Sequence, residues 1–230
     1  MTKKKNTKLN KQQRKKLELG IVLSILLLAF LLWNTFIIYP IKLFVVLTHE
    51  ISHGLSAIIS GGRLDSLLLT SSLGGESRTI GGSKFIIASA GYLGSLGFGV
   101  LLFISGYKEK FRKVFSIVLA ILLILFAANY LEGGFGRISA ILFALVFILF
   151  PIYLPQIANA YLYKVLGIVS MAYVAIDIKE DLFTNVYRPS DAQFIAEITS
   201  VSATIWSVLW MVISIATIYF VVRWGFKFKN

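Results

Sequence analysis

The sequence predicts an all-α polytopic membrane protein of about seven transmembrane or re-entrant helices. Of its 230 residues, 57% are hydrophobic and only 15% are charged, and the mean hydropathy is +0.80. Soluble domains carry about 25% charged residues, so this composition excludes an ordinary soluble fold. Apolar runs of about 20 residues, the length that crosses a bilayer, recur along most of the chain. Together these observations place the protein in a lipid bilayer.

Seven apolar segments are candidates for the predicted helices. Pro40 separates the first two, and Pro151 and Pro155 mark the turn between the fifth and the sixth. No linker interrupts the series, so we expect a single membrane-embedded domain over residues 19–230. The segments are residues 19–39, 41–60, 85–106, 112–131, 134–154, 157–182 and 194–223.

Residues 1–18 form a basic tail that we expect to be disordered and cytoplasmic. Its first 16 residues contain eight Lys or Arg and no acid. The apolar run that follows is too long for the core of a signal peptide and has no clear cleavage site, so we expect an uncleaved first span. The net charge of +12 comes largely from this tail, and the positive-inside rule and anionic lipids account for it without nucleic acid. We expect an integral membrane protein of a bacterial plasma membrane.

The segment 61–84 is the longest stretch after the tail that does not resemble a membrane span. It holds six glycines, several hydroxyl side chains and the apolar run from Leu67 to Leu69. Because Gly-Gly pairs mark turns without proving strand pairing, the segment predicts either a short β-hairpin or a plain loop. A strand here could pair with an extended substrate by β-augmentation.

Small residues recur every four positions in the third apolar segment, at Gly91, Ser95 and Gly99. This spacing lets two helix backbones approach closely. We expect the partner of this helix to be the helix over residues 41–60.

The motif HExxH lies within that 41–60 segment, as His49-Glu50-Ile51-Ser52-His53. Positions i and i+4 lie on one face of a helix, so both imidazoles can hold one Zn²⁺ ion while Glu50 reaches the water bound to it. The alternative is a chance match with two buried neutral histidines. Ionisable groups in a membrane-length apolar segment are costly and usually functional, which favours the metal site.

The third metal ligand must be a carboxylate, because the chain has no cysteine and no further histidine. Asp177 and Asp181 are spaced i, i+4 where the segment 157–182 ends. At 1.5 Å per residue, Asp177 lies about 9 Å inside that helix, nearer the depth of the two histidines. We therefore predict Asp177 as the ligand, and Asp181 as either the alternative ligand or a group that orients an imidazole. The alternative is that Asp177 and Asp181 belong to an acidic helix end that faces water and bind no metal.

Two further carboxylates lie near the last apolar segment. Asp191 follows Pro189-Ser190, and we expect it to be either the N-cap of a helix, the favoured role, or an acid at its first position. Glu197 lies one or two turns inside the segment, where a carboxylate requires a partner that the sequence does not identify.

Several motifs beyond HExxH point to one family. They are Gly61-Gly62-Arg63, Gly74 to Gly82, Ile87 to Ser95, Asp177 to Asp181, and Ser190-Asp191-Ala192. With this combination the chain resembles the M50B-like branch of the site-2 protease superfamily over most of its length after the basic tail. The resemblance implies an intramembrane zinc metalloprotease with His49 and His53 as ligands, Glu50 as general base, and an aspartate from a later helix as third ligand. The Asn-Pro…Asp-Gly pattern that carries this ligand in better-studied site-2 proteases is absent.

We therefore expect hydrolysis of peptide bonds in membrane-associated substrates, with Glu50 activating a zinc-bound water. The expected partners are a membrane protein or peptide substrate and the lipid bilayer. One alternative is a catalytically inactive zinc-containing binding or scaffold protein, against which an intact Glu50 argues. A second is a transporter that uses the buried His and Asp groups, against which the lack of an inverted repeat argues.

Overall fold

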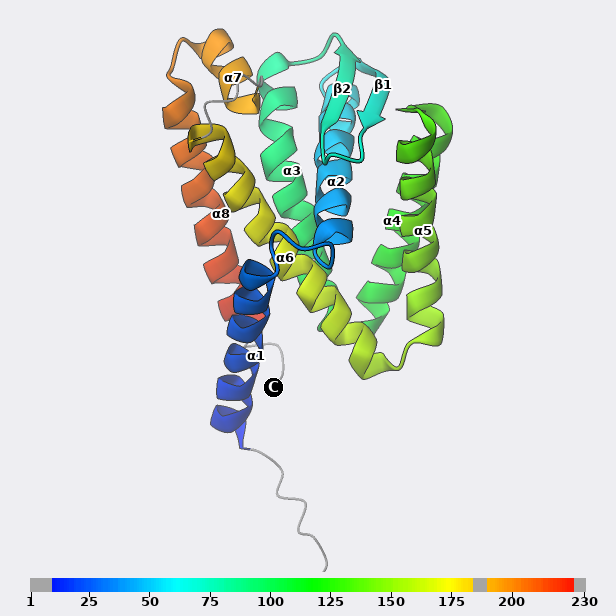
Figure 1. The fold of residues 1–230 in the computed structure, drawn as a ribbon, viewed down its shortest axis with the longest axis vertical. Coiled ribbons are helices and arrows are strands. Elements are labelled where there is room, and N and C mark those ends of the chain that lie inside the picture. The colour runs from blue at the N-terminus through cyan, green and yellow to red at the C-terminus, as the bar shows by residue number, and fades with distance from the viewer. Residues whose placement is uncertain (1–9, 184–189, 226–230) are drawn as a thin grey trace, which may run out of the picture.

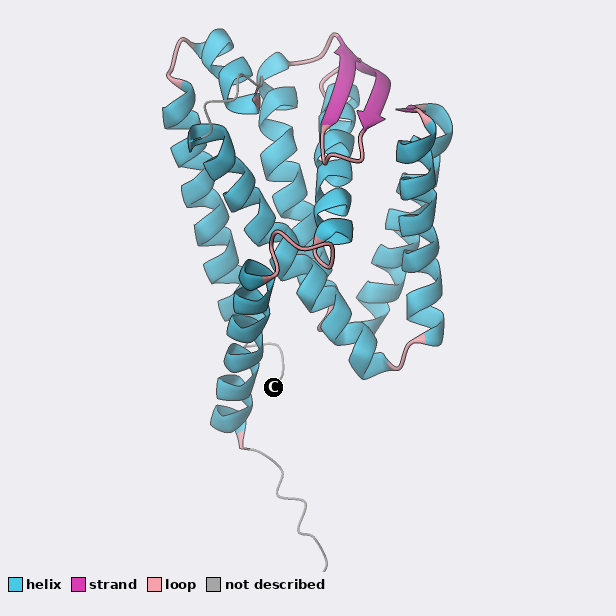
Figure 2. Cartoon of the chain, in the orientation of Figure 1, coloured by secondary structure: helices cyan, strands magenta, loops and turns pink. Residues whose placement is uncertain are grey.

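The computed structural model describes residues 10–183 and 190–225. Most of these residues are helical, and one small sheet lies at one end of the helices (Figures 1 and 2). In chain order the elements are α1 (Lys11–Leu31), α2 (Tyr39–Ile59), β1 (Arg63–Leu69), β2 (Gly75–Ile80), α3 (Lys84–Ser105), α4 (Glu109–Asn129), β3 (Leu131–Glu132), α5 (Gly134–Tyr153), α6 (Gln156–Phe183), α7 (Asp191–Thr199) and α8 (Ala203–Gly225).

Among the described residues, five helices are long and apolar enough to cross a membrane: α3, α4, α5, α6 over Gln156–Lys179, and α8. The chain is therefore an integral membrane protein, but the expected count of about seven spans is not confirmed. The apolar part of α1 is only Leu19–Leu31. Helix α2 has the length of a span, but it carries Lys42 and the polar HExxH residues.

Helix α1 begins inside the predicted basic tail. Asn10 is its N-cap, and its side chain accepts a hydrogen bond of 2.8 Å from the backbone N–H of Gln13. The glutamine side chain accepts in return from the Asn10 N–H, which completes a capping box. The expected disorder therefore does not extend to residue 18, and residues 1–9 lie outside the described part.

The glycine-rich segment forms a β-hairpin rather than a plain loop. Strands β1 and β2 are antiparallel, with Arg63 opposite Ile80 and Leu69 opposite Gly75. Strand β3 adds to β1 in parallel, with Leu131 opposite Leu67, which gives the order β2-β1-β3. In Figure 1 the hairpin lies alongside α2, with β1 on the side of α4 and α5.

Helix α3 packs between α2 and α6, and small residues permit its close approach to both. A Cβ atom on Gly94 would lie 2.3 Å from Oγ of Ser52 on α2, and one on Gly99 would lie 3.1 Å from the carbonyl of Gly167 on α6. Side chains larger than hydrogen would force these helices apart. The expected pairing of the small-residue helix with the HExxH helix is confirmed.

The last predicted span consists of two helices. Helix α7 ends at Thr199, and Ser200 then adopts a left-handed conformation with φ of 57°. Helix α8 follows and is the membrane-length element. Helix α7 packs on the start of α3, because Ala192 and Ile195 join the apolar core that α3, α6 and α8 share. This break brings the start of α7 to the HExxH helix.

Candidate metal centre and cleft

The two histidines project from the same face of α2, as the i, i+4 spacing predicts. Their rings lie 4.8 Å apart, centroid to centroid, and the side chains of His49 and His53 are 16% and 10% exposed. Tyr92 of α3 packs edge-on against His49 at 5.4 Å. Both imidazoles are thus held in a largely dry environment with their Nε2 atoms directed at α7.

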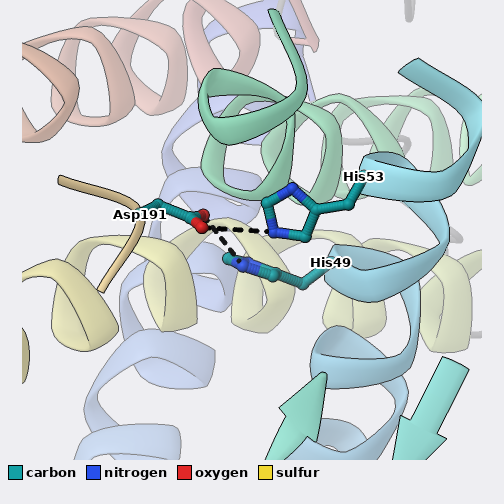
Figure 3. Close-up of side chains that lie close together, drawn as sticks. All are labelled: His49, His53 and Asp191. Carbon is teal, nitrogen blue, oxygen red and sulfur yellow. Dashed lines mark ion pairs between the residues drawn. The ribbon is translucent and has the colours of Figure 1, made fainter. Parts of the chain in front are cut away.

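Asp191 at the start of α7 meets both imidazoles (Figure 3). Its Oδ2 lies 3.1 Å from Nε2 of His49, and its Oδ1 lies 3.3 Å from Nε2 of His53. Ligand atoms bound about 2.0–2.2 Å from a tetrahedral zinc ion are separated by about 3.4 Å, so these spacings suit a shared metal. One ligand atom from each residue lies within 4.8 Å of the others.

The chemistry of this donor set fits a metal ion. Asp191 Oδ2 is buried and has no hydrogen-bond partner among the described residues, although it faces an imidazole nitrogen. Such an orphaned carboxylate oxygen is costly unless a cation compensates it. Burial alone would raise the pKa of the Asp191 carboxyl, but the two adjacent imidazoles outweigh burial and lower that pKa. The carboxylate is therefore held in the ionised form that metal ligation requires.

A hydrogen bond fixes the tautomer of His53. Its Nδ1 lies 2.7 Å from the backbone carbonyl of Ile87 on α3, and because a carbonyl only accepts, the nitrogen must carry the proton. The lone pair is then on Nε2, on the side of Asp191. Backbone carbonyls commonly orient metal-binding imidazoles in this way.

Gly91 of α3 forms the wall behind the three ligands. A Cβ atom there would lie 2.3 Å from Oδ2 of Asp191 and 2.4 Å from Nε2 of His49. No side chain fits in this space, so α3 can approach the ligands only through a glycine.

The geometry favours Asp191 over Asp177 as the candidate third ligand. Asp177 lies on α6 near His49 and lines the cavities beside it, but it is not part of the group that converges on the imidazoles. The depth argument treated α6 as upright, whereas it crosses α2 and α3 obliquely (Figure 1). Asp181 lies in the last turn of α6, and its side chain falls outside the described part of the structure.

Asp191 is the first residue of α7, the second of the two predicted positions, and not its N-cap. Ser190 is the N-cap of α7, and its side chain accepts a hydrogen bond from the N–H of Gln193, whose own side chain bonds back. The Ser-x-x-Gln spacing of a capping box is visible in the sequence, and it leaves the following aspartate without a capping function. This signal could have identified Asp191 as available for another role.

Glu50 is held by the β-hairpin. It is 7% exposed, and the hydroxyl of Ser77 on β2 donates to its Oε2 at 2.6 Å. Gly75 makes room for the carboxylate, because a Cβ atom there would lie 2.4 Å from Oε1. Glu50 lies close enough for its charge to act on both imidazoles.

A cavity of about 1210 Å³ joins the three ligands, Glu50 and the hairpin. Residues of α2, β2, α3, α6 and α7 line it, and Glu197, exposed on α7, is among them. A smaller cavity of about 200 Å³ lies against His49, Glu50 and Asp177 and extends toward Lys42 and Trp33. An extended peptide therefore has a volume to occupy directly beside the candidate metal ligands.

A comparison with protein families finds one match. The model of a family described as Peptidase M50B-like matches residues 22–221, which include every residue of the candidate centre. No curated protein and no solved structure matches the chain.

Proposed function

The chain belongs to the Peptidase M50B-like family, and from this membership and the site geometry we propose that it is an intramembrane zinc metalloprotease. Its substrates would be membrane proteins or peptides, cut at or within the bilayer. The observation that carries the proposal is that His49, His53 and Asp191 converge on one point while Glu50 lines the same cavity. A purely structural metal site has no need of that buried carboxylate.

The residues of the site have separate roles in the proposed peptide hydrolysis. His49, His53 and Asp191 would hold the Zn²⁺ ion, which when bound supplies Lewis-acid chemistry and lowers the pKa of water. Glu50 takes a proton from the attacking water and delivers it to the leaving amine. Ser77 and Gly75 keep the Glu50 carboxylate beside the cavity.

The substrate must be extended where it is cut, because the hydrogen bonds of a helix shield its carbonyls. Strand β2 lies at the edge of the described sheet, and its residues Gly75 to Ser77 line the cavity. An edge strand offers unpaired backbone groups to an extended peptide. This supports a mode of binding in which the opened segment of the substrate pairs with the hairpin.

Glu50→Gln tests the proposal. Glutamine keeps the shape of the side chain but does not accept a proton, so we expect zinc to remain near one per monomer while cleavage of a transmembrane peptide falls at least about 100-fold. Purified protein in proteoliposomes would be analysed for zinc and for peptide products. Glu132→Gln, at the exposed residue of β3, is the matched control.

Two results would overturn the proposal. A wild-type protein without zinc after supplementation would contradict the metal site. Zinc-loaded wild type that cuts no membrane peptide would favour the binding or scaffold function instead.

We further propose that the N-terminus is cytoplasmic and that the metal site opens toward the opposite side of the membrane. The end of α8 lies against the α3–α4 turn, since a Cβ atom on Gly225 would be 2.5 Å from Oη of Tyr107. Figure 1 shows the start of α1 at this same end. His53 instead contacts Ile87, near the start of α3 and therefore at the other end.

Charge supports this orientation. The start of α1, with Lys11, Arg14, Lys15 and Lys16, and the junction of α3 and α4, with Lys108, Lys110 and Lys113, lie at the end away from the metal site. The positive-inside rule assigns that end to the cytoplasm.

The ends of α4 allow a direct test of orientation. The chain has no cysteine, so single Lys110→Cys and Glu132→Cys variants report the two ends without background. A membrane-impermeant maleimide applied to intact bacterial cells should label the Glu132→Cys variant, and the Lys110→Cys variant only after lysis. The reverse labelling pattern would contradict the orientation.

A further inference from the structure

The hydrogen-bond pattern of the sheet shows where the backbone of Ser77 points. The N–H of Leu67 on β1 donates to the carbonyl of Tyr130 at 2.9 Å, on the side of β3. In a strand the N–H and C=O of one residue point to the same side, so Leu67 directs neither group at β2. Leu67 lies opposite Ser77. The two residues therefore form a non-hydrogen-bonded antiparallel pair.

In such a pair, both residues direct their backbone groups away from each other. The N–H and C=O of Ser77 thus point to the outer edge of β2, which no other described strand covers. Ser77 also lines the cavity of about 1210 Å³. A peptide strand laid along this edge would find one donor and one acceptor at Ser77, spaced as a second antiparallel strand requires.

The side chain of Ser77 points a different way. Its hydroxyl reaches α2 and lies 2.6 Å from Oε2 and 3.0 Å from the backbone oxygen of Glu50. The neighbours Glu76 and Arg78 are exposed and pair with each other at 3.0 Å on the opposite face. Ser77 therefore contacts the proposed general base with its side chain and faces the cavity with its backbone.

From this geometry we propose that Ser77 is a positioning residue that couples substrate docking to the general base. An extended substrate forms a pair of backbone hydrogen bonds with Ser77, and the hydroxyl of the same residue keeps the Glu50 carboxylate in place. The register of the substrate and the position of the base are then set by one residue. The inference rests on the proposed protease function and adds the residue that fixes the substrate's register.

Three substitutions separate the two contacts. Ser77→Ala removes the hydroxyl, and we expect kcat to fall about 10- to 100-fold with little change in KM, because a hydrogen bond to a charged group is lost. Ser77→Thr keeps a hydroxyl on a strand-forming residue and should restore most of kcat. Ser77→Pro also removes the outward N–H, and edge strands tolerate proline where that group is unpaired. We expect its KM to rise at least about fivefold above that of Ser77→Ala.

The kinetic measurements use proteoliposomes and a transmembrane peptide, with zinc content as the check on folding. Ser71→Ala, exposed in the hairpin turn, is the matched control and should behave as wild type. Unchanged kcat in Ser77→Ala, or equal KM in Ser77→Ala and Ser77→Pro, would overturn the inference while wild-type cleavage stands. Failure of the zinc-loaded wild type to cleave would overturn the proposed function and this inference with it.

Discussion

The two walls of the candidate metal centre are built differently. Helix α2 is 21 residues long, and thirteen of them are buried against α3, the sheet and the neighbouring helices. Helix α7 has nine residues, of which only Ala192 and Ile195 are buried. The first wall carries two imidazoles and Glu50, the proposed general base, and the second carries a single carboxylate.

The difference shows that the ligands on the two walls are held in position by different means. On α2 the ligands are fixed by helix periodicity, by the hydrogen bond from His53 to Ile87 and by close packing on Gly91. On α7 the ligand depends on one capped turn beginning at Ser190 and on the packing of a short helix. The fold preorganises the α2 wall, and under the proposed function we expect the α7 wall to gain definition from the bound metal.

We expect the largest effect from a substitution that removes the ligand on α7 and leaves the ligands on α2 in place. In Asp191→Asn we expect zinc to fall from near one per monomer to near zero in dilute buffer, because one of three protein ligands is lost. Asp177→Asn, the matched substitution in the same cavity, should retain its zinc. Elemental analysis of the purified variants measures both. Loss of zinc in Asp177→Asn with retention in Asp191→Asn would return the assignment to Asp177.

A smaller effect comes from the helix behind both walls. Gly91→Ala places a methyl group where Asp191 and His49 already lie, so one ligand must shift, and we expect zinc affinity to fall about tenfold or more. Gly97→Ala on the same helix meets no atom within 4 Å and serves as the control. Competition with a chromogenic chelator gives both affinities. Equal affinities would show that the centre adapts to the added methyl group.

The HExxH centre was accessible to sequence reasoning because its geometry is local. Residues four apart on a helix share a face whatever surrounds them, so His49 and His53 could be paired before any fold was known. For the segment 61–84 the sequence could not decide between a hairpin and a plain loop. Glycine pairs mark turns, but strand pairing depends on the partner strands.

The third ligand was not accessible because it depends on tertiary arrangement. Asp177 and Asp191 are both carboxylates near helix ends, and choosing between them requires the tilt of α6 and the break at Ser200. The count of about seven spans is not confirmed, for a related reason. Apolar composition alone does not show that α1 ends at Leu31 or that α7 and α8 are separate helices.

The place of Asp191 in the chain also bears on biosynthesis. His49 and His53 enter the membrane early in translation, whereas Asp191 follows only after α3 to α6 have been made. A nascent chain therefore holds a pair of imidazoles without the carboxylate that completes the centre. Under the proposed function, the chain cannot bring its three candidate metal ligands together, and so cannot cleave neighbouring membrane proteins at the insertion machinery, until most of its own helices have been synthesised.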